Sequence, residues 1–318
     1  MLRLRATLPG MRALLALVLL AIPVPVWAGA VLVVNSAAAS LSVVDMATQR
    51  EVRRIPVLRE PHHVALTPDG RGLLVGDTGG NTLFELNPVD FSVIRRIPAS
   101  DPYQLGFSPD GRMLTVNGLA RNQVDIYDAA TYKLLKRLPA ETMPSHLAYA
   151  PDSSMVYITL QGTDSVMAID LRNWQVLWKA KVGRTPAGVL WHDGHLIVAN
   201  MGEDYISVLD PVDGHTLRTV VTGKGAHQLF LSPDQRTLWV NNRVGGTTTA
   251  LDAATLAVRR SYAVPGGPDD IDFAPDGKLW ITLRFTHDVA IMDPATGALS
   301  RIEVGRSPHG LFLNAAAH

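Results

Sequence analysis

The residues best suited to chemistry in this chain are histidines that recur at one place in a repeated segment. Five of the ten histidines come one or two positions after the proline or alanine that opens the segment, at His62, His63, His146, His227 and His309. Neutral imidazole nitrogens on rigid strands are donors that Cu or Zn accepts. If the repeats bring these side chains together, they form a candidate metal site.

Other polar residues stand at the same or matching positions of the repeats. The candidate set for an organic ligand is Gln104, Gln228, Asp270, Arg243 and Arg284. A guanidinium group binds a carboxylate through two parallel hydrogen bonds, so the two arginines suit an acidic ligand. Two other interpretations stay open. The arginines can pair with Asp269, Asp270 or Asp204 at a rim, or the polar side chains simply line a water-filled channel.

The element that must position these residues is a long-period repeat. Each unit ends an apolar run in Asp, or once in Asn, at Asp45, Asn87, Asp128, Asp170, Asp210, Asp252 and Asp293. The successive spacings are 42, 41, 42, 40, 42 and 41 residues. A near-constant period of this length is typical of propellers and of helical solenoids.

The local pattern favours strands over helices. Short alternating or β-branched runs, such as residues 82–86 and 196–198, recur within the units. Turn sequences such as Pro68-Asp69-Gly70 separate the runs in register, and the frequent Pro and Gly would break helices. The sequence therefore predicts an all-β fold, a seven-bladed β-propeller with four strands in each blade.

The two ends of the repeat array complement each other. Residues 308–313 repeat the first run of a unit, but nothing follows to complete that unit. Residues 31–35 and 41–45 match the later runs of a unit that has no first run of its own. Because a blade cannot bury both faces alone, we expect a ring closed by pairing of the C-terminal strand, residues 309–313, with the N-terminal blade, residues 31–57.

Strand direction predicts where the polar residues gather. Strands in an antiparallel blade alternate in direction, so the loops that enter the innermost strands all lie on one face. The five histidines, Gln104, Gln228 and Asp270 begin innermost strands, and Arg243 and Arg284 follow second strands, which end on that face. We expect these side chains at the mouth of one axial channel, and His192, His195 and His215 on the other face.

The units also carry a family resemblance. Pro-x-x, alternating apolar residues, Ser-Pro-Asp-Gly, a strand ending in Asn and a strand ending in Asp resemble the YVTN-type β-propeller repeat of YncE-like and cytochrome-d1-like propellers. The resemblance covers essentially all of the chain after residue 28 and implies the propeller fold. Similar propellers hold haem in cytochrome-type nitrite reductases or copper in nitrous oxide reductases, and others look like accessory proteins of quinone-cofactor dehydrogenases. The resemblance therefore implies a tetrapyrrole, a quinone or copper as ligand classes.

The N-terminal residues predict export. Basic residues precede an apolar run at residues 13–24, and Val26 and Ala28 are the small residues that a signal peptidase inspects. We divide the chain into a signal peptide, residues 1–28, and a single propeller domain, residues 29–318. The apolar run is shorter than the roughly 20 residues of a membrane-spanning helix. We expect a periplasmic or secreted protein with no membrane span after signal cleavage.

Composition excludes several kinds of chemistry. The chain has no cysteine, which excludes disulfides, covalent haem attachment, iron–sulfur clusters and thiolate metal sites. Lys plus Arg and Asp plus Glu number 29 each, so no overall positive field attracts nucleic acid, and no nucleic-acid partner is expected.

The leading hypothesis is a binding or accessory protein whose ligand, cofactor or protein partner lies on the face where the innermost strands begin. The alternative is an oxidoreductase that uses the same histidines with Cu, a tetrapyrrole or a quinone. A third interpretation is a hydrolase similar to propeller lactonases, in which Asp270 and His309 or His227 act as an acid–base pair. The sequence leaves open whether the protein is an enzyme.

Overall fold

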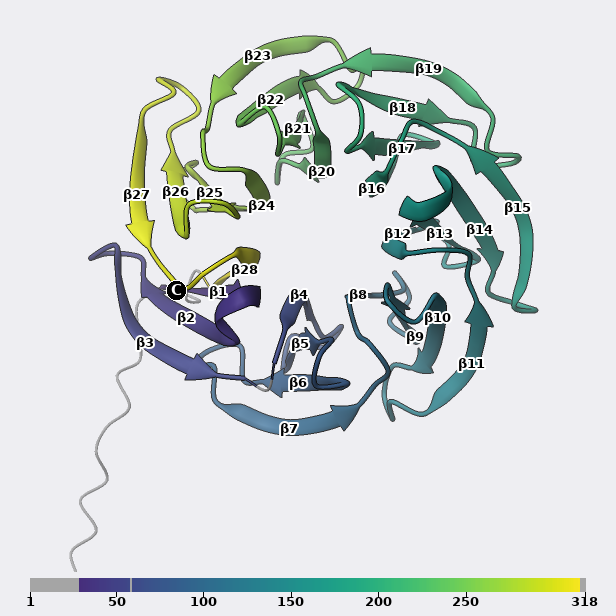
Figure 1. Ribbon diagram of the computed structural model, residues 1–318, viewed down its shortest axis with the longest axis horizontal. Helices are drawn as coiled ribbons and strands as arrows, with labels where there is room; N and C mark the ends of the chain where they lie inside the picture. The colour runs from purple at the N-terminus through teal and green to yellow at the C-terminus, as the bar shows by residue number, and fades with distance from the viewer. Residues whose placement is uncertain (1–28, 58, 315–318) are drawn as a thin grey trace, which may run out of the picture.

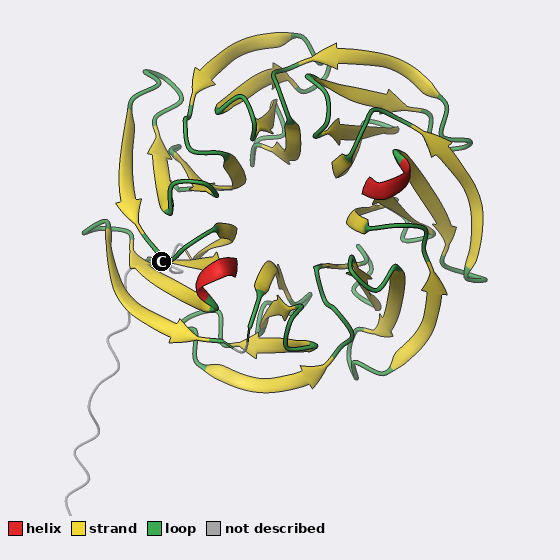
Figure 2. Ribbon diagram, in the orientation of Figure 1, coloured by secondary structure: helices red, strands yellow, loops and turns green. Residues whose placement is uncertain are grey.

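Seven antiparallel sheets of four strands stand around one axis and form a closed ring (Figure 1). The computed structural model describes residues 29–57 and 59–314, so the predicted signal peptide lies outside the described residues. Helix within the described chain is confined to two short 3-10 segments, η1 (Ser36–Ala38) and η2 (Gln161–Thr163) (Figure 2). The predicted all-β, seven-bladed propeller is confirmed.

Each blade runs from an innermost strand, A, to an outermost strand, D. Blades one to three consist of β4 (Pro61–Leu66), β5 (Leu73–Asp77), β6 (Thr82–Leu86), β7 (Val93–Pro98); β8 (Gln104–Phe107), β9 (Met113–Gly118), β10 (Gln123–Asp128), β11 (Leu134–Pro139); and β12 (Pro144–Tyr149), β13 (Met155–Leu160), β14 (Ser165–Asp170), β15 (Gln175–Lys181). Blades four to six consist of β16 (Pro186–His192), β17 (His195–Asn200), β18 (Tyr205–Leu209), β19 (Thr216–Val221); β20 (Ala226–Leu231), β21 (Thr237–Asn242), β22 (Thr247–Asp252), β23 (Val258–Ala263); and β24 (Pro268–Phe273), β25 (Leu279–Leu283), β26 (Asp288–Met292), β27 (Leu299–Glu303). The closing blade consists of β28 (Pro308–Asn314), β1 (Ala30–Asn35), β2 (Ser40–Asp45) and β3 (Arg50–Pro56).

The apolar core lies between neighbouring blades. Leu32 and Val34 of β1 pack against Leu73, Val75 and Phe84 of blade one, and all five side chains are at most 1% exposed. Burying a side chain of this size stabilises the fold by roughly 1.5–3 kcal/mol. Both faces of each middle strand are therefore covered only when the neighbouring blades are in place.

The ring is closed by the two ends of the chain, as predicted. Strand β28 pairs with β1 in antiparallel register, with Leu311 opposite Val33 and Leu313 opposite Val31. Blade six supports β28 from its other side, because Asp270 Oδ2 accepts a hydrogen bond of 2.9 Å from the Leu311 N–H. Asp272 Oδ2 accepts a second hydrogen bond, of 2.7 Å, from the Leu313 N–H. The closing strand is thus held by a ladder on one side and by two carboxyl groups on the other.

No helix in the described part of the chain combines the length and the apolar composition that a membrane crossing requires.

Removing residues 309–318 tests the role of the closing strand. The deletion takes away most of β28, including Leu311 and Leu313, and leaves β1 without its inner partner. Loss of one buried leucine side chain costs about 2–5 kcal/mol, and a whole domain is stable by only about 5–15 kcal/mol. We expect the shortened chain to lose its cooperative urea unfolding transition. Deletion of residues 315–318 alone keeps β28, and this control should unfold like the full chain.

Candidate functional site

A β-bulge sets the direction of the two residues that follow the opening proline of strand A. The register between strands A and B shifts between Pro61 and Val64 and between Pro144 and Leu147, and four other blades shift at the matching place. The residues inside the bulge lose their ladder partners. Instead, the His146 N–H donates to Thr159 Oγ1 at 3.0 Å. Bulges re-aim side chains, and here they direct the predicted histidines toward the axis.

Five imidazoles from four blades form one continuous cluster at the hub. The ring centroids are 4.9 Å apart for His62 and His309, 4.4 Å for His63 and His309, and 5.1 Å for His63 and His146. His227 continues the chain of rings at 5.5 Å from His146. All five are at most 7% exposed. The structure brings the five rings together, and their role as ligands of a metal or an organic group stays a prediction.

Charged and aromatic side chains complete this hub cluster, which comprises His62, His63, Tyr103, His146, His227, Arg243, Asp269, Arg284 and His309. The Tyr103 ring lies 4.6 Å from that of His62. The Asp269 carboxylate is 1% exposed, and Arg243 donates a hydrogen bond to its Oδ1. His227 Nδ1 lies 2.9 Å from the same oxygen, and Arg284 Nη1 lies 3.6 Å from Oδ2. Two guanidinium groups therefore face a single carboxylate, which is the pairing with Asp269 considered from the sequence.

Burial lowers the pKa values of four imidazoles of the hub cluster. Desolvation is the largest cause that holds the pKa values of His63, His146 and His309 well below the ordinary 6.5, and a nearby arginine lowers each of them further. Burial and the Arg243 charge lower the pKa of His227 to about 4. Neutral imidazoles offer lone pairs to a hydrogen-bond donor or to a metal ion.

The Asp269 carboxylate of the hub, unlike these imidazoles, is held in its charged form. Burial by itself would raise the pKa of Asp269, but Arg243 and the imidazoles of His309 and His227 outweigh it and hold that pKa well below the ordinary 3.8. The Asp269 carboxylate therefore stays ionised in the middle of the hub.

Several buried polar atoms of the hub lack a hydrogen-bond partner among the described residues. They are His62 Nδ1, His146 Nε2, Arg243 Nε and Asp269 Oδ2. Buried polar atoms are rarely left without a partner, since each one costs about 1–3 kcal/mol. Their concentration in one cluster marks the hub as a place where a bound group would gain hydrogen bonds.

The other predicted ligand-binding residues lie outside the hub cluster. Asp270 turns toward β28, and burial, followed by the charge of Asp269, raises its pKa well above 3.8. Gln104 lines a hollow of about 350 Å³ together with Tyr149 and Trp191. Gln228 lies against blade four, where its Oε1 would be 2.5 Å from a Cβ added at Gly188. A ligand role for these three residues stays a prediction. Asp269 and Tyr103 are not in the candidate set, although each directly follows the opening proline of its unit, as His62 does.

The histidines form no evident metal centre. Among residues 29–57 and 59–314, no group of three or more His, Asp or Glu side chains is arranged to hold a metal ion. The closest pair of ring nitrogens in the cluster is His63 Nε2 and His309 Nε2, which lie 3.0 Å apart. In this arrangement the two rings share a hydrogen bond.

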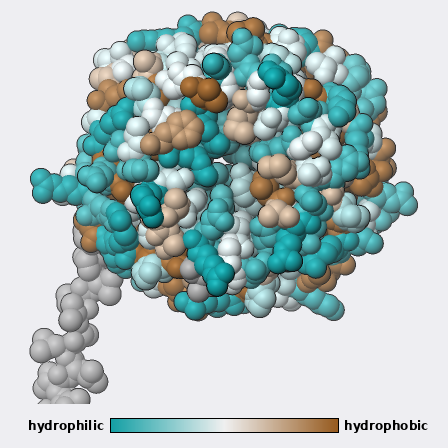
Figure 3. All heavy atoms as spheres, in the orientation of Figure 1, coloured by the Kyte–Doolittle hydropathy of each residue, from teal (hydrophilic) through white to brown (hydrophobic). Residues whose placement is uncertain are grey.

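A hollow of about 370 Å³ opens beside the hub cluster, and we call it the seam hollow. It is lined by Ser36, Ala37, Arg59, Glu60, Gly79, Arg284 and Ser307. Arg284 belongs to both sites, and Glu60 Oε1 lies 3.4 Å from His62 Nε2. In the space-filling view down the axis, hydrophilic residues frame the narrow central opening together with scattered apolar ones (Figure 3).

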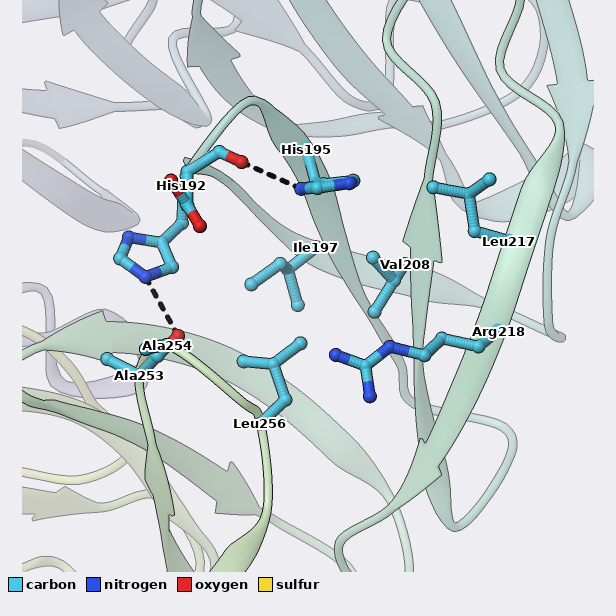
Figure 4. Close-up of a pocket in the computed structure, with 10 residues that line it drawn as sticks. His192, His195, Ile197, Val208, Leu217, Arg218, Ala253, Ala254 and Leu256 are labelled. Atoms are coloured by element: carbon cyan, nitrogen blue, oxygen red, sulfur yellow. Dashed lines mark hydrogen bonds between the residues drawn. The ribbon is translucent and has the colours of Figure 1, made fainter.

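The opposite face has a separate and smaller pocket of about 90 Å³, between blades four and five (Figure 4). His192 Nε2 donates to the Ala253 carbonyl at 2.9 Å, and His195 Nδ1 donates to the Asp193 carbonyl at 2.7 Å. Both histidines sit at the turn between β16 and β17, apart from the hub as expected. Their ring nitrogens serve to order turns.

The fold and the hub define the class of this protein: a seven-bladed β-propeller with a buried, histidine-rich hub. Its sequence matches the YNCE-like beta-propeller family over residues 10–318, and the chain belongs to that family. No curated protein matches the sequence.

Solved structures resemble the protein in fold. A functionally unknown protein from Desulfotomaculum acetoxidans has a TM-score of 0.77 at 15% identity, over 89% of this chain and 98% of its own. PpgL, a periplasmic gluconolactonase from Pseudomonas aeruginosa, has a TM-score of 0.72 at 19% identity, over 90% of this chain and 99% of its own. The dihydro-heme d1 dehydrogenase NirN, in complex with DHE, has a TM-score of 0.66 at 16% identity, over 89% of this chain and 74% of its own. At such identities the likeness shows the fold alone.

Neutral, buried histidines make stability fall in acid. The four imidazoles with lowered pKa values are His63, His146, His227 and His309. Between about pH 4 and pH 6.5 the unfolded chain therefore binds more protons than the folded one, and stability decreases as the pH falls through this window. Asp101, Asp270 and Asp272 act in the opposite direction, because their raised pKa values let the folded chain keep protons that the unfolded chain loses. The four imidazoles outnumber these three carboxyl groups, so we expect a net loss of stability from pH 7 to pH 5.

Replacing His146 with Asn isolates one of these groups. The substitution should reduce the slope of unfolding free energy against pH by up to about 1.4 kcal/mol per pH unit. Urea unfolding at pH 5, 6 and 7 measures this slope. His195 is exposed on the other face, so His195→Asn should keep the original slope. An unchanged slope in His146→Asn would show that this imidazole is charged in the folded protein.

Proposed function

We propose that this protein is an exported binding or accessory module, periplasmic or secreted, that holds the acidic group of a ligand or partner at the hub cluster. The observation that carries this proposal is the set of buried nitrogen atoms without a hydrogen-bond partner on His62, His146 and Arg243. An acidic group beside Arg243 and Arg284 would balance the second guanidinium and accept hydrogen bonds that the cluster leaves unmade. The basic residues and apolar run at the N-terminus support export.

The size of the hub limits what enters it. The imidazole centroids are already 4.4 to 5.5 Å apart along the cluster, so a tetrapyrrole macrocycle does not fit among them. A single carboxylate reaching in from the mouth is small enough. A quinone or tetrapyrrole ligand therefore fits this proposal through its carboxylates only, with its ring system outside the cluster. The likeness to NirN in complex with DHE supports a tetrapyrrole as one compound to test.

Metal-dependent oxidoreductase activity is the second candidate. The observation that favours it is the close approach of two neutral imidazole nitrogens, His63 Nε2 and His309 Nε2, beside the partnerless His146 Nε2. These three nitrogens are of the type that Cu or Zn binds. The rings would have to move to bind a metal, because the described residues present no set of three arranged for one.

The lactonase-like alternative proposed Asp270 as its base, and the Asp270 carboxyl group is engaged by the closing strand. Asp270 accepts the Leu311 N–H, and the carboxylate beside His227 and His309 is that of Asp269. Since both Arg243 and Arg284 approach Asp269, its carboxylate is a weak base. The gluconolactonase PpgL keeps simple lactones in the set of compounds to assay.

Ligand titration with hub variants tests the proposed function. Protein purified without a His-tag is titrated calorimetrically with haem, a quinone carboxylate, and Cu²⁺ or Zn²⁺. An acidic ligand should bind, and Arg243→Gln should weaken binding tenfold or more, which corresponds to about 1.4 kcal/mol. Arg112→Gln is the control, because Arg112 is 84% exposed in a turn of the opposite face.

The metal candidate gives a different result in the same titration. It predicts at least one ion bound per chain, with the ion lost when His63 and His146 are both changed to Ala. Binding of an acidic ligand that survives Arg243→Gln, or no binding by any compound, contradicts the proposed function. Circular dichroism of each variant confirms that the propeller is folded.

A further inference from the structure

The seam hollow is built on the join that closes the ring. Ser36 follows β1 and Ser307 precedes β28, so both ends of the described chain contribute to it. The Ser36 N–H donates to the Ser307 carbonyl at 3.0 Å, and Ser36 Oγ donates to the Pro61 carbonyl of blade one at 2.6 Å. Arg284 completes the lining from blade six. Three blades therefore meet around this hollow.

The charges of the seam hollow suit an anion. Arg59 and Arg284 both line it, and Arg284 also lies 3.6 Å from Asp269 Oδ2 of the hub cluster. Glu60 is the one acidic residue of the lining, and its carboxylate is engaged by Thr78 Oγ1 at 3.3 Å and by His62 Nε2 at 3.4 Å. Two guanidinium groups that line one hollow can both donate hydrogen bonds to a carboxylate or a phosphate.

The hollow also has room and hydrogen-bonding groups for a polar body. Its volume of about 370 Å³ lies within the roughly 300–1,000 Å³ of small-molecule sites. A Cβ added at Gly79 would stand 2.8 Å from the Arg59 Cβ, so glycine at this place leaves space beside the arginine. Serine hydroxyls and the Glu60 carboxylate are partners for hydroxyl groups, whereas the lining offers no large apolar side chain.

We infer that the seam hollow binds a small hydroxylated anion, such as a sugar acid, and that this binding holds the ring closed. The acid group lies between Arg59 and Arg284, and the hydroxyl groups face Glu60 and the serines. Only the closed ring brings the three blades together, so the ligand stabilises the closed form by mass action. The inference goes beyond the proposed function, because Arg59 does not belong to the hub cluster.

Calorimetric titration and hydrogen–deuterium exchange test this inference on the full chain. D-gluconate is the probe, and inorganic phosphate and sodium chloride at equal ionic strength are the comparisons. We expect gluconate to bind, to raise the melting temperature and to slow exchange severalfold in β1 and β28. Arg59→Gln should weaken gluconate binding tenfold or more and remove the protection of the seam, whereas Arg112→Gln should change neither.

Each other outcome has a definite meaning. Equal binding of phosphate and gluconate would overturn the role of the hydroxyl groups, and equal protection by sodium chloride would overturn the site itself. Gluconate binding that persists in Arg59→Gln would also overturn it. Arg59→Gln should leave ligand binding at the hub unchanged, while Arg243→Gln impairs the hub. A failure of the seam site is thereby distinguished from a failure of the proposed function.

Discussion

The antiparallel pairing of β28 with β1 is the interaction on which the rest of the hub depends. It fixes His309, whose ring contacts those of both His62 and His63, although His309 and His63 are 246 residues apart in the chain. The entropy of closing a loop grows only with the logarithm of its length, so such a distant contact is little harder to form than one across half the chain. The carboxyl groups of β24 that hold Leu311 and Leu313 then lock the closing strand from its other side.

The hub tolerates a buried carboxylate because two arginines, Arg243 and Arg284, pair with the one Asp269. A buried carboxylate would normally take up a proton, but the two arginines keep Asp269 ionised. Burial and, to a smaller extent, the same arginines lower the pKa values of His63, His146, His227 and His309. The result is a site with fixed positive charge, one fixed negative charge and several uncharged nitrogen atoms. Because the two guanidinium groups exceed the single carboxylate by one positive charge, an acidic ligand suits this site better than a free metal ion.

The sequence predicts the scaffold well and the inner details less well. A spacing of 40 to 42 residues, turns in register and two incomplete ends are enough to predict seven blades and their closure, because each is a property of the repeat. Strand direction places the histidines on one face for the same reason. Which of two adjacent residues points to the axis depends on the bulge. The bulge after Pro268 puts Asp269 in the hub and turns Asp270 toward Leu311, and the Asp270 N–H is satisfied by Thr282 Oγ1.

The symmetry of the scaffold does not extend to its chemistry. Blade four places Ala187 at the position that holds His62, Tyr103 or Asp269 in other blades, so it adds no charge to the hub. Arg243 and Asp269 come from blades five and six, while the aromatic rings of His62 and Tyr103 come from blades one and two. A ligand would therefore meet a charged side and an aromatic side and would bind in one orientation. Because the buried middle strands do not contribute these residues, hubs can differ among propellers of one fold, and the function of this chain must be argued from its own hub.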